Sequence, residues 1–314
     1  MIDVSIVIPF LNEEGNIPNL ITALNEYFST NTDISVEVIL VDDGSTDNSI
    51  NILKQQKNKG YFLRLISLSK NFGSHAAVRA GTLHANGNYT IFLPADLQDP
   101  LTLIHTCFNI VKEYNYEIVF AYRQETSNSL FETFFSKLYA YCMRKFVITD
   151  FPDKGFDIVF FSKKIKNELN KNIESNSSIQ LQILNLGFST KEIYYNKQER
   201  KIGKSKWTIS KKIKLLIDSF VAFSYAPIRF VSFVGILFFI LGIVWSFYIV
   251  GRKILINDLE TGWPMLTSIL LLGFGITNIG LGIIAEYLWR TLDASRKRPV
   301  FIIDKIIELN NMKY

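Results

Sequence analysis

Val36-Glu37-Val38-Ile39-Leu40-Val41-Asp42-Asp43-Gly44-Ser45 is an apolar run that ends in two adjacent carboxylates and a glycine. An uninterrupted run rich in β-branched residues is typical of a strand buried on both faces of a sheet. Residues 46–56 follow with the spacing of an amphipathic helix. The segment therefore predicts a strand, an acidic turn and a helix in succession.

The same pattern recurs through the first part of the chain. Further apolar runs at residues 4–8, 63–68, 89–93 and 117–121 alternate with helix-spaced segments at residues 16–28, 74–85 and 101–114. This alternation predicts an α/β domain with a mostly parallel, doubly wound, Rossmann-like sheet. Ligands of such sheets bind at the carboxyl ends of the strands, so the residues after each run are candidates for function.

One strand end reads Leu93-Pro94-Ala95-Asp96-Leu97-Gln98-Asp99-Pro100, and we call residues 93–100 the acidic turn. Asp96, Gln98 and Asp99 offer the hard oxygen ligands that Mg²⁺ or Mn²⁺ prefers, at a place where a diphosphate could bind beside the metal. The plain alternative is a solvated turn in which Pro100 starts the next helix.

Two other strand ends are acidic. Pro9-Phe10-Leu11-Asn12-Glu13-Glu14 follows the first run, and Asp42 and Asp43 follow the second. Adjacent carboxylates repel unless a cation or hydrogen-bond donors offset their charge, so either pair alone would also fit a helix-capping cluster. Their order and spacing, taken together with Ser69-Lys70-Asn71-Phe72-Gly73 and the acidic turn, are much more specific.

Composition limits the classes of partner. Hydrophobic residues make up 48% of the chain, the mean hydropathy is +0.16, and the excess lies toward the C-terminus. The net charge of +5 is modest, and basic residues crowd at 197–214 and 290–298, which favours an anionic lipid surface over a nucleic acid. Two cysteines are too few for a disulfide framework, and the three histidines lack metal-ligand spacing.

The last third of the chain predicts attachment to a membrane. Residues 208–224 have the pattern of a basic interfacial helix, and residues 230–250 and 264–285 carry no charge over lengths that can cross about 30 Å of hydrocarbon. Basic residues before the first span and after the second place both chain ends in the cytoplasm. The expected organisation is a cytosolic domain (1–207), a juxtamembrane amphipathic helix (208–228), two transmembrane helices (229–290, about 230–250 and 264–287) and a cytosolic tail (291–314).

On these motifs the chain resembles the inverting family 2 glycosyltransferases, and within them the polyprenyl-phosphate glycosyltransferases related to dolichol-phosphate mannose synthase and the bacterial bactoprenol glucosyltransferases. The matching segments are residues 7–14, 40–47, 68–81, 94–100 and 200–207, with the pair of C-terminal spans. The resemblance implies a GT-A fold, a UDP- or GDP-sugar donor, Mg²⁺ or Mn²⁺ as cofactor, and an undecaprenyl or dolichyl phosphate acceptor. It also implies a multi-pass protein of the inner or plasma membrane with its catalytic domain in the cytoplasm, and it leaves a homo-oligomer open.

The resemblance assigns roles to donor-side residues. Pro9, Glu13, Asp42, Asp43 and Lys70 are the implied nucleotide contacts.

Metal and acceptor roles follow from the same resemblance. Asp96 and Gln98 are the implied ligands of the metal or the diphosphate. The implied acceptor or diphosphate contacts are Arg123, Arg200, Ser205 and Lys206. For Arg123 the alternative is an ordinary surface salt bridge.

Two departures from the family pattern matter. The family commonly has Asp-x-Asp where this chain has Pro94-Ala95-Asp96, so the first carboxylate is absent. Relatives often carry Gly-Asp-Phe-Arg in the acceptor loop, where this chain has Asp153-Lys154-Gly155-Phe156-Asp157. Asp157 is the better match for the catalytic carboxylate, Asp153 is its competitor, and the arginine is missing.

The sequence thus favours an inverting sugar transfer to a lipid phosphate, with Asp157 and Asp96 as catalytic residues. Other classes stay open. Pro94 is compatible with a membrane-tethered nucleotide-sugar binding or scaffold protein without catalysis, and two spans offer little surface for a transporter. A processive polysaccharide synthase would share the nucleotide-binding half, but the chain has no Gln-x-x-Arg-Trp segment.

Overall fold

In the computed structural model, the first four predicted strands form the parallel centre of one sheet. They are β1 (Val4–Phe10), β2 (Val36–Asp42), β3 (Phe62–Leu68) and β4 (Tyr89–Phe92). Parallel pairing joins β3 to β2, β2 to β1 and β1 to β4, which confirms the predicted parallel core. The structure describes residues 2–124, 151–152, 157–171, 178–198, 262–296 and 299–309, together with single positions between 137 and 148 and between 230 and 251.

Four more strands extend this core on both sides. They are β5 (Ile118–Arg123), β6 (Ile158–Ser162), β7 (Thr190–Tyr195) and β8 (Ile303–Glu308). Among the described residues the strand order is β7-β5-β6-β4-β1-β2-β3-β8. β6 is antiparallel to both of its neighbours, β4 and β5, so the sheet is mixed rather than wholly parallel.

Helices cover both faces of the sheet, as the two buried clusters of apolar side chains show. α1 (Ile17–Thr30), α2 (Ser49–Gln55) and α4 (Thr102–Tyr114) pack on one face, where they meet Ile6, Val38 and Leu40. α3 (Ser74–Leu83), α6 (Lys163–Lys171) and α7 (Ile179–Asn185) pack on the other, where they meet Val7, Ile39 and Val41. Alternate residues of the central strands therefore enter opposite cores, which is why these strands read as continuous apolar runs.

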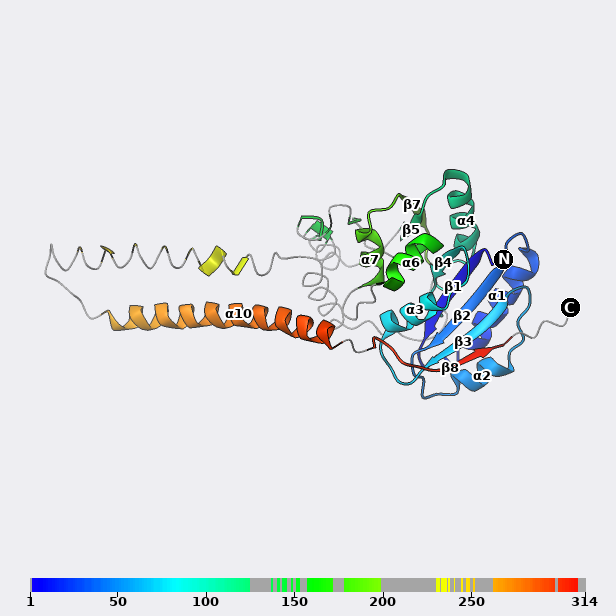
Figure 1. The fold of residues 1–314 in the computed structure, drawn as a ribbon, viewed down its shortest axis with the longest axis horizontal. Coiled ribbons are helices and arrows are strands. Elements are labelled where there is room, and N and C mark those ends of the chain that lie inside the picture. The colour runs from blue at the N-terminus through cyan, green and yellow to red at the C-terminus, as the bar shows by residue number, and fades with distance from the viewer. Residues whose placement is uncertain are drawn as a thin grey trace. The chain divides into compact units, whose positions relative to one another are not determined.

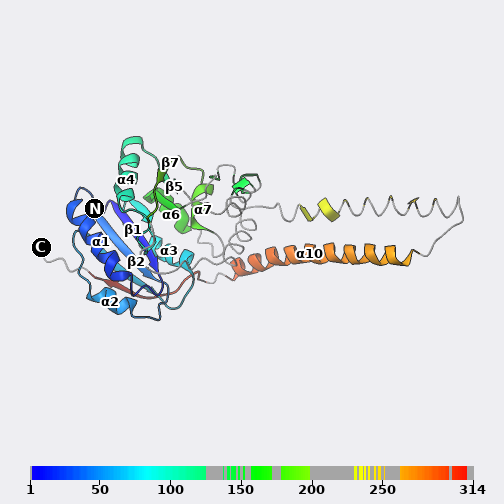
Figure 2. The same ribbon diagram turned by 180° about the vertical axis from the view of Figure 1, so that it is seen from behind.

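The C-terminal strand β8 was not predicted. It pairs antiparallel with β3, from Leu68 opposite Ile303 to Arg64 opposite Glu308, although the two strands lie at opposite ends of the sequence. In Figures 1 and 2 it lies beside β3 at the edge of the sheet. The residues expected to form a cytosolic tail thus include part of the domain core, because Phe301 and Ile307 pack against the two apolar clusters.

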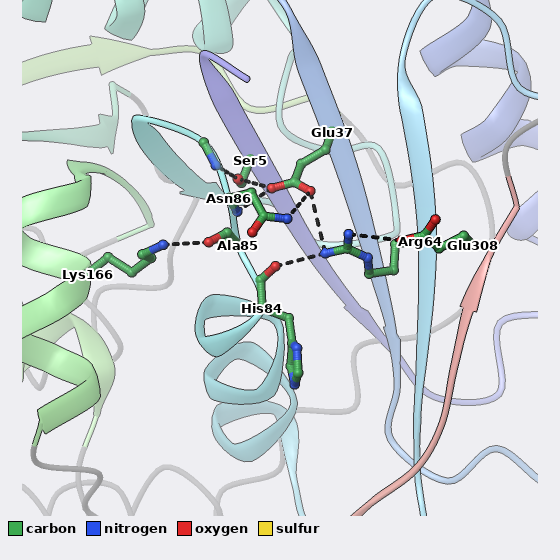
Figure 3. A network of polar contacts seen from close by, with 9 residues as sticks. Ser5, Glu37, Arg64, His84, Ala85, Asn86, Lys166 and Glu308 are labelled. Carbon is green, nitrogen blue, oxygen red and sulfur yellow. Dashed lines mark hydrogen bonds and ion pairs between the residues drawn. The ribbon is translucent and has the colours of Figure 1, made fainter. Parts of the chain in front are cut away.

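A polar network closes the amino-terminal edge of the sheet (Figure 3). The buried carboxylate of Glu37, in β2, accepts hydrogen bonds from the Ser5 hydroxyl (2.5 Å) and from the backbone amide of Asn86, and lies 3.6 Å from Arg64 Nη1. Arg64 also donates to the His84 carbonyl (2.9 Å). A charge inside an apolar sheet is stable only with such partners, so the network fixes the entry to β4 next to β1 and β2.

The second compact unit spans Ile217–Arg298. It contains α10 (Trp263–Ser295), in which a Cβ placed on Gly280 would lie 2.9 Å from Val231 Cγ1. Within the part of the chain that the structure describes, no helix has the length and apolar character needed to cross a membrane. The predicted amphipathic helix at 208–228 lies outside the described residues.

We expect Glu37→Gln to lower the free energy of unfolding of the domain by about 2–4 kcal/mol. The new side-chain NH₂ group would face the groups that now donate to the carboxylate, and Arg64 would lose its buried negative partner. Thermal unfolding followed by circular dichroism measures the change. Glu308→Gln is the matched control: this exposed carboxylate also contacts Arg64 (3.3 Å), and its loss should cost less than about 1 kcal/mol. Equal losses for the two variants would contradict the proposed importance of the buried network.

Candidate functional site at the carboxyl edge of the sheet

The strand directions bring the predicted site residues to one edge. β1 to β5 and β7 end there, and β6, which runs the other way, begins there. β1 lies between β2 and β4, so Asp42 and Asp96 follow strands that are about 10 Å apart, two strand spacings. The pattern of strand-end acids thus corresponds to a spatial cluster. This edge carries Glu13, Asp42, Lys70, Asp96, Arg123 and Asp157.

The loops after β1 and β2 are joined by reciprocal hydrogen bonds. The Asn12 amide donates to Ser45 Oγ (2.9 Å), and the Thr46 amide donates back to Asn12 Oδ1 (2.8 Å). The Glu13 amide donates to Ser49 Oγ (2.9 Å). Because this cross-linking holds residues 43–48 out of helical conformation, α2 begins at Ser49 and not at residue 46 as the spacing predicts.

Asp42 and Asp43 are both buried, but the structure gives them different surroundings. The Asp43 carboxylate accepts hydrogen bonds from the backbone amides of Phe72 (2.8 Å) and Gly73 (3.0 Å), at the start of α3. Its pKa is raised, mainly by burial and against these hydrogen bonds. Among the described residues, the Asp42 carboxylate accepts one hydrogen bond, from the Ser45 amide to Oδ1 (3.0 Å). Asp43 therefore ties its loop to the start of α3, whereas Asp42 has fewer hydrogen-bond donors among the described residues.

Gly44 allows the loop after β3 to approach this pair. Its φ of +77° is a left-handed conformation, and a Cβ at this position would lie 2.5 Å from the Lys70 carbonyl carbon. Glycine avoids both the strain and the clash. The side chain of Lys70 is exposed, with Nζ 5.2 Å from the centre of the Phe72 ring.

The remaining donor-side residues lie on β1 and its loop. Pro9 is at the carboxyl end of β1, in register with Val41. Glu13 Oε2 accepts a hydrogen bond from Asn16 Nδ2 (2.6 Å), which orients its carboxylate at the start of α1.

The acidic turn has an unusual backbone. Leu97 adopts φ +56°, a left-handed conformation that non-glycine residues rarely take, and the Gln98 amide donates to Asp96 Oδ1 (3.2 Å). The sequence offers Asp99 as a metal ligand, but the structure gives its carboxylate other partners. It is buried, its Oδ1 accepts a hydrogen bond from the Tyr195 hydroxyl (2.5 Å), and Lys197 Nζ lies 3.6 Å from the same oxygen. Burial raises the pKa of Asp99.

Arg123 and Asp157 form a bidentate ion pair on the other side of the acidic turn. Arg123 Nε donates to Asp157 Oδ2 (2.8 Å), and Arg123 Nη2 lies 2.7 Å from Asp157 Oδ1. The hydrogen bond to Asp157 raises the pKa of the arginine. The side chain of Asp157 is 11% exposed and that of Arg123 is 43% exposed, so the pair opens to solvent on the arginine side. An arginine of β5 thus lies beside Asp157, whose own loop sequence lacks one.

Several predicted residues cannot be placed. Asp153, Arg200, Ser205 and Lys206 lie outside the described residues. Within the described ranges, no group of three or more His, Cys, Asp or Glu side chains is arranged to hold a metal ion. Metal binding by Asp96 and Gln98 would therefore need oxygen atoms from another source.

Sequence reasoning missed Tyr195 and Lys197. β7 reads Thr-Lys-Glu-Ile-Tyr-Tyr and is largely exposed, so no apolar run marks it. The spacing of Ile193 and Tyr195 could have indicated the strand, because residues two apart lie on the same face and both side chains pack in the same core cluster.

Comparison with known proteins gives three findings. The family model described as "Glycosyl transferase family 2" matches residues 5–178. The chain is 33% identical to the uncharacterized glycosyltransferase YkcC of Bacillus subtilis, over 99% of this chain and 96% of that protein. It is 29% identical to undecaprenyl-phosphate 4-deoxy-4-formamido-L-arabinose transferase of Yersinia pestis, over 97% of this chain and 93% of that protein.

A solved structure shares the fold. The crystal structure of glucosyl-3-phosphoglycerate synthase from Mycobacterium tuberculosis, in complex with Mn²⁺, uridine diphosphate and phosphoglyceric acid, superposes with a TM-score of 0.50. The match has 14% sequence identity and covers 70% of this chain and 76% of that chain. It supports the assignment of a GT-A, Rossmann-like α/β domain.

We expect Gly44→Ala to destabilise the domain by more than about 2 kcal/mol, because the left-handed backbone costs about 1–2 kcal/mol and the clash with Lys70 adds to it. Hydrogen exchange should also be faster at the Phe72 and Gly73 amides, since the loop must move away from Asp43. Gly187→Ala is the control, because Gly187 has a similar φ of +69° and open space where the new Cβ would lie. If both variants lose the same stability, close approach of the loop to Gly44 is not the constraint.

Proposed function

The chain belongs to glycosyl transferase family 2, and from this we propose that it transfers a sugar, with inversion, from a nucleotide-sugar donor to a polyisoprenyl phosphate at a membrane. The observation that carries the proposal is the common edge of the sheet at which Asp42, the acidic turn and the Arg123–Asp157 pair lie. A nucleoside diphosphate bound at this edge would lie next to a charged pair that could bind an acceptor.

The donor would lie across the ends of β1 to β4. Pro9, Glu13 and Asp42 are the proposed contacts of the nucleoside, because they lie at or just after the carboxyl ends of the adjacent strands β1 and β2. The carboxylates of Glu13 and Asp42 can accept hydrogen bonds from base and ribose groups. Asp43 holds the loop that carries Lys70, whose exposed ammonium group is available to the diphosphate. UDP-sugars and GDP-sugars both fit this description.

Mg²⁺ or Mn²⁺ fits the acidic turn if the donor supplies the remaining ligands. Asp96 offers a carboxylate and Gln98 an amide oxygen, and Gln98 Nε2 donates to the Gln198 carbonyl (3.4 Å). The formal charge of Asp96, Asp99, Asp157, Arg123 and Lys197 sums to −1, which also favours a cation. When bound, the metal would neutralise charge on the departing nucleoside diphosphate. Pro94 removes one carboxylate of the usual motif and makes the donor's oxygens more important.

The acceptor would react from the side of Arg123 and Asp157. An oxygen of the lipid phosphate attacks the anomeric carbon, the bond from that carbon to the donor diphosphate breaks, and a sugar phosphodiester and a nucleoside diphosphate result. A phosphate monoester has its second pKa near 6, so the nucleophile is mostly ionised at neutral pH without a strong base. Asp157, held at both oxygens by Arg123, is suited to orient the acceptor, and the partly exposed guanidinium is suited to pair with its phosphate.

A membrane location is part of the proposal. The proposed transmembrane helices at about 230–250 and 264–287 rest on the uncharged sequence there, because no helix among the described residues meets the criteria for a span. The exposure of large apolar side chains on α10 also supports them, since Phe274 and Ile279 are more than 60% exposed in the isolated chain. Arg200, Ser205 and Lys206 would then lie close to the bilayer and help bind the lipid phosphate. The relative from Yersinia pestis is named as an undecaprenyl-phosphate transferase, which supports an acceptor of this class.

The test is product analysis with the full chain in proteoliposomes that contain undecaprenyl phosphate or dolichyl phosphate. A panel of UDP- and GDP-sugars is supplied with Mg²⁺ or Mn²⁺, and butanol-extracted lipids are analysed by mass spectrometry. We expect one lipid-linked monosaccharide. Donor binding without transfer would favour a scaffold protein, and a polymeric product would favour a processive synthase.

Replacement of the two catalytic candidates should have unequal effects above about pH 8, where the acceptor phosphate is ionised. We expect Asp96→Asn to lower kcat by at least about a hundredfold, because electrostatic stabilisation of the leaving group is lost. Asp157→Asn should lower it by less and mainly raise the KM for the lipid. Steady-state kinetics with both substrates measure this, with Glu308→Gln as the control. The opposite ranking would refute the assigned roles.

A further inference from the structure

The acidic turn holds a conformation that its own sequence disfavours. Leu97 has φ +56°, and a left-handed leucine persists only where surrounding contacts compensate for its strain. Its side chain packs against the core cluster below the turn. This contact fixes one point of the turn, while the polar groups on either side of Leu97 need separate support.

That support comes from residues 195–198, at the end of β7. The Gln198 amide donates to the Gln98 carbonyl (2.8 Å), and Gln98 Nε2 donates to the Gln198 carbonyl (3.4 Å). The Tyr195 hydroxyl donates to Asp99 Oδ1 (2.5 Å), and Lys197 Nζ lies 3.6 Å from that oxygen. Backbone and side-chain contacts thus join the segment to two consecutive residues of the acidic turn.

The same segment is fixed on its other side by β5. Tyr195 is in register with Arg123, and the Gln124 amide donates to the Tyr195 carbonyl (2.8 Å). Arg123 in turn holds Asp157. Tyr195 is therefore the residue through which the acidic turn and the Arg123–Asp157 pair are connected.

We infer that residues 195–198 are a positioning clamp for the acidic turn, with Tyr195 and Lys197 as positioning residues that act through Asp99. The clamp sets the placement of Asp96 and Gln98 relative to Arg123 and Asp157. This inference deepens the proposed function, on which its consequence for catalysis rests. Two apolar side chains in place of Tyr195 and Asp99 could fill the same space. They would not fix the orientation of the acidic turn, because only a hydrogen bond has a preferred distance and angle.

Tyr195→Phe tests the clamp because it removes one hydroxyl and keeps the ring. Tyr194→Phe is the matched control, since it removes the hydroxyl of the adjacent, exposed tyrosine. Hydrogen exchange of the full chain in detergent, without nucleotide or metal, should become at least about tenfold faster at the amides of residues 97–99 in Tyr195→Phe. Exchange at those amides should be unchanged in Tyr194→Phe.

Lys197→Gln is a second variant, in case loss of the Tyr195 hydroxyl prevents folding. Its side chain is partly exposed, so the fold should tolerate the change. A smaller acceleration of exchange at the same amides is expected. Unchanged exchange at residues 97–99 in the folded variants would overturn the clamp.

The functional arm uses Mn²⁺ itself as probe, with UDP or GDP, and free Mn²⁺ is measured by electron paramagnetic resonance. Tyr195→Phe should weaken Mn²⁺ uptake about tenfold and raise the donor KM, with little change in the lipid KM, a split that a general loss of stability would not produce. Normal Mn²⁺ affinity in a variant with accelerated exchange would overturn the positioning role. If wild-type chain takes up no Mn²⁺ with either nucleotide while exchange responds as expected, the clamp stands and the metal-dependent function fails.

Discussion

The central strands of this protein are buried on both faces, and this constraint governs where polar chemistry can occur. β1 and β2 present alternate side chains to two separate apolar cores, so an ionisable group within them must be fully paired, as Glu37 is. Charged groups without such partners are confined to the strand ends. Because most strands run in the same direction, their carboxyl ends meet at one edge, and the candidate site residues are gathered there by topology.

The two edges of the sheet use similar residues for different purposes. At the amino-terminal edge, Glu37 and Arg64 are enclosed by hydrogen bonds and tie β4 and β8 to the centre. At the carboxyl edge, Asp43 and Asp99 serve in the same structural way, since Asp43 accepts hydrogen bonds from the loop before α3 and Asp99 accepts one from Tyr195 at the end of β7. They hold the loops between which Asp42, Asp96 and Arg123 lie. Two of the acidic residues singled out by the motifs, Asp43 and Asp99, thus support the loops that carry the others.

Much of this arrangement could be predicted from the sequence. The first five strands were recognised within two residues at each end, because buried parallel strands leave an unmistakable apolar run. β7 and β8 could not be recognised, since edge strands such as Ile303–Glu308 mix charged and apolar residues without regular alternation and resemble a solvated tail. The pairing of Asp157 with Arg123 was also hidden, because it depends on the antiparallel insertion of β6. Motifs singled out the candidate carboxylates, but only three-dimensional contacts showed that Asp43 and Asp99 are hydrogen-bonded to neighbouring segments of the protein.

The return of the chain to its first domain through β8 has a consequence for topology. A strand can pair with β3 only if both segments are in the same compartment. Whatever path the residues between β7 and β8 take, an excursion through a bilayer must therefore be a round trip, with an even number of crossings. This parity follows from backbone hydrogen bonding alone and is independent of any hydropathy scale or charge bias.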